Sequence, residues 1–423
     1  MSKDQSLLES VSKFFTESTL ADIVAKVFEV NSKDVRVLSW DFGNASGKGD
    51  SYLSTVDRVI IKSNVKNEEK EVKLVVKSLP NNMGRRKTYR SAEFFHNEIL
   101  FYTEIAEKFE EYLKAKNQSS LFLVPECVAY HLDGQEDYIA LKDVCPLGFG
   151  PASRQSCLTL DQCRFMLEAM ARFHGISFAY KDQFKEDFEA RASKLNETYF
   201  TTEIYETWYK NFHNILLRVA KDALAKEYPG SEGEQRFNSY QPGALYQKCV
   251  DFCSRWHAST SVVNQGDSWA PNFLIRTDPV GNTEVLMLDF QLARSSSPVL
   301  DLSFFIYSCT DKSLRDKHFD DLLDIYHKEL TKTIKILGSD PDKVYPKQLF
   351  LEEVKEQFIH GMVFGLESVS FSMLSEDESF DLDVIKEDKV DIADVWTLQN
   401  IKTSENRRRL ADIILHASER GFL

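Results

Sequence analysis

Two short apolar runs constrain the fold of this chain more than any other feature. NFLIR at 272–276 and EVLMLDF at 284–290 flank the turn-forming segment TDPVGNT, a pattern that predicts a β-hairpin. With the turn centred near Val280 and Gly281, facing residue numbers sum to about 561, which places Asn272 beside Asp289. Asp289 ends a run that should be buried, where an unpartnered carboxylate would cost several kcal/mol. An amide oxygen beside a carboxylate suits Mg²⁺, so the hairpin predicts a divalent-cation site.

A second polar position lies five residues before Asn272. Gly266 and Asp267 precede Pro271, which biases Ala270 away from helix and keeps the stretch irregular. Such a loop can direct Asp267 at a substrate hydroxyl while Asn272 reaches the metal. The dipeptide alone would indicate an ordinary turn aspartate, but the D-x-x-x-x-N spacing followed by a strand-ending D-F favours a catalytic role.

The first part of the chain carries a complementary pair of charges. Glu98 has aromatic and aliphatic neighbours at helical spacing on both sides, so it is planted in an apolar helix face. Lys77 alternates with Val75 and Leu79 on one side of a predicted strand. An ion pair between Lys77 and Glu98 would satisfy both groups and is typical of a lysine held against nucleotide phosphates. The alternative is a Lys77 that reaches solvent from a strand edge.

A glycine-rich segment, FGNASGKGDSYLS, lies between the first two predicted strands. Gly43, Gly47 and Gly49 would let the backbone approach an anion closely. The spacing fits neither G-x-x-x-x-G-K-[ST] nor G-x-G-x-x-G. By itself the segment would be interpreted as a plain hairpin loop.

The order of patterns along the chain predicts an α+β fold with two lobes. Residues 1–144 contain two leading helices, three β-rich runs, a helix from about Thr88 to Phe109 and two further strands, which together make a five-stranded antiparallel sheet. CPLGFGPASRQS at 145–156 predicts a hinge or linker. Residues 157–423 are mostly amphipathic helical runs interrupted by the hairpin. The acidic stretch 376–394 is expected to be a solvated excursion.

Composition excludes several classes of partner and location. The 52 basic and 66 acidic residues give a net charge of -14, the wrong sign for coating nucleic acid or an anionic membrane. No run approaches the ~18 apolar residues of a membrane-spanning helix, and the first residues lack a secretory pattern. The seven cysteines include no C-x-x-C and fit reduced thiols. We expect a cytoplasmic protein without nucleic-acid or membrane partners.

Taken together, these motifs resemble the insect ecdysteroid kinase-like (CHK kinase-like) family, related to choline and aminoglycoside kinases. The resemblance rests on Lys77, Glu98, the segment ALKDV, and the segments NQGDSWAPN, LMLDFQLAR and PVLDLSFF. It implies a two-lobed protein-kinase-like fold, with a small sheet lobe that binds nucleotide and a larger helical lobe that carries the catalytic loop and acceptor site.

The resemblance also implies a role for each matching residue. Asp267 matches the catalytic aspartate and Asp301 the aspartate that supports the catalytic loop; Asn272 and Asp289 match the metal ligands. Nucleotide contacts are implied for a larger set, namely Gly43, Gly47, Gly49, Lys77, Glu98, Leu141 and Asp143. Asp301 could otherwise be an ordinary helix-start aspartate.

The chain departs from the family pattern at two of these motifs. Gln265 stands where the family usually has histidine, and Lys142 where the hinge usually has glutamate. Gln265 puts the packing of the loop in doubt more than its chemistry. His174 occupies a position that the family often fills with histidine, and we interpret it as structural.

The function implied is Mg²⁺-dependent transfer of phosphate from ATP to a hydroxyl group of a small molecule, such as an ecdysteroid, another steroid or a foreign alcohol being detoxified. Eleven residues separate Asp289 from Asp301, too few for the segment that displays a peptide in protein kinases. An aromatic region at 199–212 could line the acceptor pocket, although core packing is the simpler interpretation. The alternative function is a kinase-fold binding protein with little turnover. The sequence leaves the acceptor and the oligomeric state open.

Overall fold

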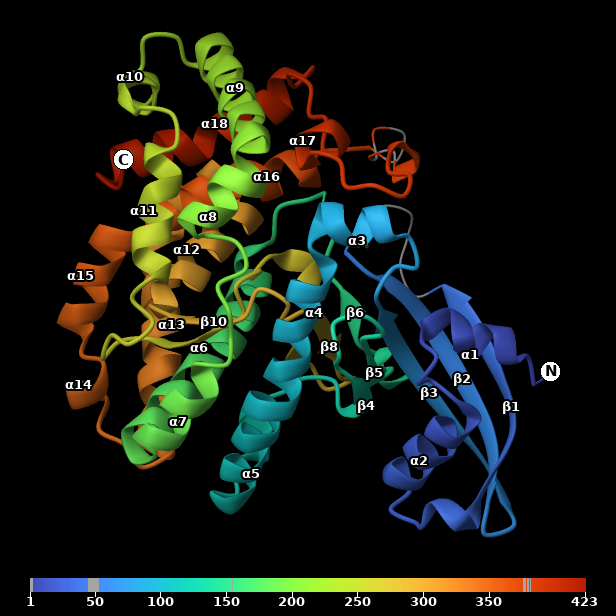
Figure 1. Cartoon of the computed structure of the whole chain (residues 1–423). Helices are drawn as coiled ribbons and strands as arrows, with labels where there is room; N and C mark the ends of the chain where they lie inside the picture. The colour runs from blue at the N-terminus through green and yellow to red at the C-terminus, as the bar shows by residue number, and fades with distance from the viewer. Residues whose placement is uncertain (1–2, 45–52, 154, 376–377, 379, 381) are drawn as a thin grey trace.

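The computed structural model describes residues 3–44, 53–153, 155–375, 378, 380 and 382–423. The chain forms a small lobe built on a sheet and a larger helical lobe (Figure 1). This arrangement confirms the predicted α+β fold with two lobes. Within the described residues, no helix is both long and apolar enough to span a membrane.

The small lobe contains a five-stranded antiparallel sheet with the strand order β1-β2-β3-β5-β4. Its strands are β1 Val35–Asn44, β2 Thr55–Val65, β3 Glu68–Ser78, β4 Cys127–His131 and β5 Tyr138–Lys142. Alternate residues point to opposite faces. Val59, Leu74 and Ala140 join one core with the leading helices α1 Gln5–Val11 and α2 Glu17–Val27, whereas Ile139 and Leu141 join the core of the helical lobe. The side chains of β5 therefore alternate between the two cores.

The helix predicted from Thr88 to Phe109 is interrupted. It consists of α3 Met83–Tyr89, α4 Ser91–Leu100, a π-helical segment η2 Phe101–Ala106 and α5 Glu107–Ala115. Arg90 has φ 56° in the left-handed region, which ends α3 and starts α4 in a new direction. Because α4 begins afresh, its buried face, including Glu98, is directed at the β3 side of the sheet.

The large lobe is assembled from helices. They are α6 Leu160–Gln183, α7 Lys185–Ala192, α8 Thr202–Ile204, the π-helical η5 Tyr205–Tyr209, α9 Lys210–Glu227, α10 Glu232–Ser239, α11 Ala244–Cys253, α12 Pro298–Cys309, α13 Lys312–Ile336, α14 Pro341–Val344, α15 Lys347–Gln357, α16 Ile359–Ser372, α17 Ile392–Val395 and α18 Ser404–Glu419. α12 packs closely on α16, since a Cβ added at Gly361 would lie 2.1 Å from the carbonyl carbon of Ser303. This contact fixes the helix that carries Asp301.

The predicted hairpin is present inside the helical surroundings. β8 Phe273–Thr277 pairs with β9 Thr283–Met287, and the short strand β6 Gly150–Pro151 adds to β8. Beside it, β7 Val262–Asn264 pairs with β10 Arg294–Ser296. The pairing of Phe273 with Met287 places Asn272 opposite Leu288, one residue from the predicted partner Asp289. The difference arises because the turn is symmetric about Val280.

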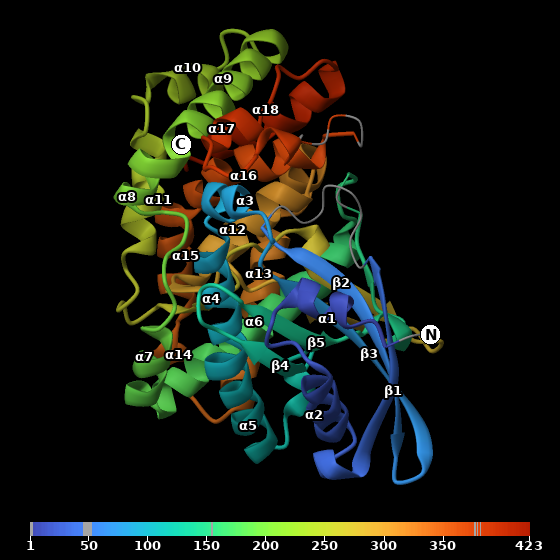
Figure 2. The same cartoon turned by 45° about the vertical axis from the view of Figure 1, so that its right-hand side comes forward.

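The acidic stretch near the C-terminus is solvated at its charged residues, as predicted, but its apolar residues are anchored on the protein. Residues 384–396, here called the strap, cross α3 of the small lobe. Asn82 Nδ2 donates to the Ile385 carbonyl at 3.3 Å, and Val390 N donates to Thr88 Oγ1 at 3.1 Å. Ile385, Ile392 and Trp396 are buried. Both views place α3 close to α17 (Figures 1 and 2). The apolar residues interspersed among the charges anchor the strap.

Candidate functional site

The loop after β7 is held by the carboxylate of Asp301 in the first turn of α12. Asp301 Oδ2 accepts a hydrogen bond from Gln265 N at 2.7 Å, and Oδ1 accepts one from Gly266 N at 2.9 Å. Gly266 has φ +86°, and a Cβ there would lie 2.0 Å from the Leu292 carbonyl oxygen. These contacts therefore fix the backbone conformation of the two residues that precede Asp267.

His174 completes this clamp from α6. Its ring is fully buried, with Nε2 3.2 Å from Asp301 Oδ2 and Nδ1 2.6 Å from the Tyr326 hydroxyl. The histidine thus positions Asp301 rather than facing a substrate. Sequence reasoning left His174 outside the site, and the histidine of MARFHG was the signal that pointed to it.

Gln265 links the loop to the hairpin. Its Nε2 donates to the Leu288 carbonyl, and its Oε1 accepts a 2.8 Å hydrogen bond from Ser268 Oγ. The side chain is fully buried. Gln265 thereby ties the residue before Asp289 to the loop of Asp267. The sequence put the packing of this loop in doubt, and the side-chain amide of Gln265 holds the loop through these two hydrogen bonds.

Asp267 is oriented by Asn272, which lies five residues later in the chain. Asn272 Nδ2 donates to the backbone oxygen and to Oδ2 of Asp267, both at 2.9 Å. Desolvation, followed by the nearby charge of Asp289, raises the pKa of Asp267 to about 8, and the Asn272 hydrogen bond opposes this rise. Asp267 as a whole residue remains partly exposed.

Asp289 lies where the small lobe meets the hairpin. Its φ of 58° is in the left-handed region, an unusual conformation for a non-glycine residue. The next residue, Phe290, is fully buried and stacks on Phe101 of η2, with ring centroids 3.5 Å apart. The aromatic contact and the turned backbone together hold Asp289 between the lobes.

Lys77 of β3 and Glu98 of α4 meet Asp289 at this junction. Lys77 Nζ is 2.7 Å from Glu98 Oε1 and 3.4 Å from Asp289 Oδ1. Burial alone would lower the pKa of Lys77, but the two carboxylates raise it above its ordinary value, which keeps the amine protonated. The side chain of Lys77 is 15% exposed, so the strand-edge alternative is wrong.

The oxygen atoms of Asn272 and Asp289 fit a hard cation. Asn272 Nδ2 is engaged with Asp267, which leaves Asn272 Oδ1 available as a ligand. No described residue donates a hydrogen bond to this oxygen. Asp289 Oδ1 is buried and has no hydrogen-bond donor among the described residues, although Lys77 lies nearby. No cluster of three or more His, Cys, Asp or Glu suited to a metal occurs in that part of the chain. Two protein ligands suit Mg²⁺ that also binds phosphate oxygens.

The structure brings only some of the predicted nucleotide-contact residues close to Lys77 and Glu98. Gly43 is the last residue but one of β1, whereas Gly47 and Gly49 lie outside the described residues. Leu141 is buried within β5, between Val75 and Cys127.

Asp143 directly follows β5. Its amide donates to the Lys73 carbonyl at 3.0 Å, and its carboxylate accepts from Cys145 N at 2.9 Å. In this conformation the Asp143 amide is engaged within the protein. Lys142 is paired with Glu126 at 2.5 Å.

The aromatic region at 199–212 is core. Tyr199, Trp208, Tyr209 and Phe212 are buried and pack on one another. Two of them, Tyr199 and Tyr209, contact a carboxylate that sequence reasoning missed, Glu367 of α16.

Glu367 is a buried acid without a cation partner among the described residues. It accepts hydrogen bonds from the Tyr199 hydroxyl at 2.7 and 2.8 Å and from the Tyr209 hydroxyl at 2.6 Å. Burial raises the pKa of Glu367 to about 7, while the two hydroxyls oppose the rise. Its charge also contributes to the raised pKa of Asp267. A lone glutamate in the apolar run VFGLESVSF was the available signal.

Solved structures that match the chain include an ethanolamine kinase, an aminopropanol kinase and an aminoglycoside phosphotransferase. The Plasmodium vivax ethanolamine kinase is 11% identical, with a TM-score of 0.40, and the match covers 88% of this chain and 89% of that chain. A microcompartment-associated aminopropanol kinase is 11% identical, with a TM-score of 0.39 and coverage of 96% and 99%. The GDP complex of an aminoglycoside 2'-phosphotransferase-IIIa is 14% identical, with a TM-score of 0.35 and coverage of 83% and 96%.

At the sequence level, no curated protein matches the chain significantly. The model of the ecdysteroid kinase-like family matches residues 48–339, which is more than half of the chain and includes the loop of Asp267 and the hairpin. The chain therefore belongs to the ecdysteroid kinase-like family.

Proposed function

We propose that the protein transfers the γ-phosphoryl group of ATP to a hydroxyl group of a small molecule in a Mg²⁺-dependent reaction. The meeting of Lys77, Glu98 and Asp289 carries this proposal, because three distant segments place a protonated amine beside a carboxylate at the junction of the lobes. Membership of a kinase-like family supports the same reaction class.

Each residue has a defined task in this reaction. Lys77 would neutralise phosphate oxygens of ATP, with Glu98 fixing its position. Asp267 accepts the proton of the acceptor hydroxyl as the new oxygen–phosphorus bond forms and the bond between the γ-phosphorus and ADP breaks. Asn272 and Asp289 would hold Mg²⁺, which supplies positive charge against the phosphates.

The raised pKa of Asp267 has a physical consequence for this task. A base must be deprotonated to accept a proton, and Asp289 is one of the causes that keep the proton on Asp267. A cation held by Asp289 would offset that charge and lower the pKa of Asp267 toward the working pH. Asp267 would therefore lose its proton, and become able to act as a base, once the site holds the cation and the nucleotide.

For the acceptor, we propose an ecdysteroid, or another steroid or foreign alcohol in a detoxification reaction, acted on in the cytoplasm. β10 and α12 follow Asp289 within a few residues, which leaves no extended segment to display a peptide. The family assignment supports the steroid class. We favour catalysis over a kinase-fold binding protein because Gln265, the main departure from the family pattern, makes the hydrogen bonds that hold the loop.

The test is transfer of labelled phosphate from ATP to a panel of steroid and xenobiotic alcohols. The wild-type protein should label at least one alcohol in the presence of Mg²⁺ and none in excess chelator. Asp267→Asn should retain nucleotide binding, measured by calorimetry, and lose transfer. Nucleotide binding by the wild type without transfer to any alcohol would contradict catalysis and support the binding-protein alternative.

A further inference from the structure

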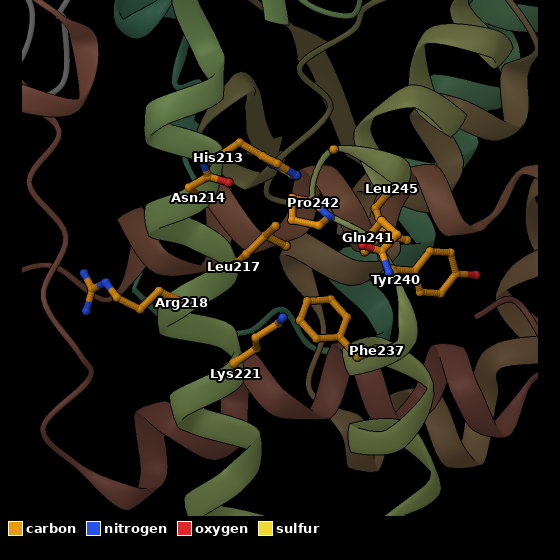
Figure 3. Close-up of a pocket in the computed structure, with 11 residues that line it drawn as sticks. His213, Asn214, Leu217, Arg218, Lys221, Phe237, Tyr240, Gln241, Pro242 and Leu245 are labelled. Carbon is orange, nitrogen blue, oxygen red and sulfur yellow. The ribbon is translucent and has the colours of Figure 1, made fainter.

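A cavity outside the catalytic residues lies between α9 and the turn that joins α10 to α11 (Figure 3). Its volume is about 330 Å³, within the range of small-molecule sites. Leu217, Phe237, Pro242 and Leu245 supply apolar walls. None of the residues assigned above to the catalytic loop, the metal ligands or the phosphate contacts lines it.

One wall of the cavity carries an unsatisfied polar group. His213 of α9 is 1% exposed, and its Nε2 is buried without a hydrogen-bond partner among the described residues. Burial lowers the pKa of His213 to about 4, so the ring is neutral and can exchange one hydrogen bond with a neutral group. An unpaired buried nitrogen is costly, which makes a ligand hydroxyl or carbonyl a favourable partner.

The ring of His213 is held by its neighbours. Its centroid lies 5.8 Å from the rings of Tyr209 and Tyr246 and 5.9 Å from the ring of Tyr205. A Cβ added at Gly243 would lie 2.8 Å from the Tyr205 hydroxyl, so the turn packs tightly against this aromatic group. The orientation of the imidazole is therefore built into the wall.

A free positive charge lies at the other end of the same helix face. Leu217 and Lys221 follow His213 by one and two turns, so His213 and Lys221 are separated by about 12 Å along the axis. Lys221 makes no hydrogen bond or ion pair with the rest of the described chain, whereas Arg218 beside it is engaged with Asn400 and Leu398. In Figure 3 the Lys221 amine extends toward the ring of Phe237.

We propose that this cavity is a second, non-catalytic binding site for an elongated apolar molecule with a hydroxyl group at one end and a carboxylate at the other. The hydroxyl bonds to His213 Nε2 in the depth of the cavity, the apolar body lies along Leu217 and Phe237, and the carboxylate pairs with Lys221 at the rim. The site is independent of the proposed phosphate transfer, because it shares no residue with it.

The test uses 4'-hydroxybiphenyl-4-carboxylate and two truncated probes, biphenyl-4-carboxylate and 4-phenylphenol, in calorimetric titrations of the full chain. The complete probe should bind most tightly. His213→Phe keeps an aromatic ring but loses the nitrogen, and should weaken the complete probe about 5- to 10-fold while leaving biphenyl-4-carboxylate unchanged. Lys221→Ala should weaken both carboxylates and spare 4-phenylphenol.

The controls separate this site from the catalytic one. Lys226→Ala on the same helix removes a lysine that is paired with Asp222 and should change no affinity. Leu217→Trp fills the cavity and should abolish binding of all three probes, which provides a second variant if His213→Phe does not fold. Asp267→Asn should bind the probes like the wild type, whatever its transfer activity. Absence of binding by the wild type, or equal binding by His213→Phe, Lys221→Ala and the wild type, would overturn the proposal.

Discussion

Replacement of Asp301 by asparagine tests the clamp that sets the catalytic loop. The carboxylate accepts two backbone amides, from Gln265 and Gly266, and contacts the imidazole of His174. An asparagine side chain has one oxygen, so in either orientation its amino group faces a donor. One charge-assisted hydrogen bond is lost, at about 1.5–3 kcal/mol, and one buried N–H is left unpaired, at about 1–3 kcal/mol. We therefore expect Asp301→Asn to lower the free energy of unfolding by about 3–5 kcal/mol.

The same substitution should affect catalysis more than nucleotide binding. Asp267 directly follows the clamped amides, and displacement of a reacting group by about 1 Å can cost about 100-fold in rate. The contacts of Lys77 with Glu98 and Asp289 are untouched, so nucleotide affinity should change by less than a few fold. Urea unfolding, followed by tryptophan fluorescence, measures the free energy of unfolding. Release of ADP measures the rate of transfer, and calorimetry measures nucleotide affinity.

Asp187→Asn provides the matched control for this experiment. Asp187 also accepts hydrogen bonds, from Arg191 and Tyr180, but it lies near the surface, with a side chain that is 41% exposed. Its replacement should cost less than about 1 kcal/mol. Equal losses of stability for Asp301→Asn and Asp187→Asn, or full transfer activity of Asp301→Asn at a temperature where it is folded, would refute the assigned role of the clamp.

Three further substitutions test other parts of the structure. Lys77→Met should reduce transfer at least 100-fold and weaken nucleotide binding while circular dichroism stays native, because the amine that meets the phosphates is lost; retention of activity would argue against this site. The free energy of unfolding should fall as pH rises from about 4.5 to 7, by at most about 1.4 kcal/mol per pH unit from Glu367, because the folded state holds a proton that the unfolded state releases. Glu367→Gln should reduce this slope in urea titrations, and an unchanged slope would contradict the raised pKa. Gly84→Ala places a Cβ 2.7 Å from the Asp388 carbonyl oxygen and should destabilise the protein by about 1–3 kcal/mol, with faster proteolysis in the strap; unaltered digestion would show that the contact is dispensable.

Local patterns were sufficient to predict the lobes and the charged residues at their junction. Strand alternation placed Lys77 on an inner face, and helical spacing placed Glu98 on an apolar one, and the structure joins them at 2.7 Å. The hairpin was also predicted, but its register differs by one residue, because a turn symmetric about Val280 and one centred between Val280 and Gly281 have nearly the same sequence signal.

Contacts between distant segments were beyond the reach of those patterns. The charges of the strap correctly suggested solvent exposure, but the burial of Ile385 and Ile392 depends on contacts with segments that lie far away in the sequence. The left-handed Arg90 gave no sequence signal for the break between α3 and α4. His174 could not be assigned to Asp301 without a fold that brings residues 127 positions apart within 3.2 Å. The roles of Asp267, Asn272 and Asp301 in transfer stay predictions.

The strap adds to the contacts that hold α3 against the helical lobe. Asn82 and Thr88 bind the backbone of the strap at Ile385 and Val390. Trp208 of η5 also donates to the Thr88 carbonyl, so the C-terminal end of α3 is held by two segments that lie far apart in the sequence. Any movement that separates α3 from the helical lobe would have to break these hydrogen bonds together.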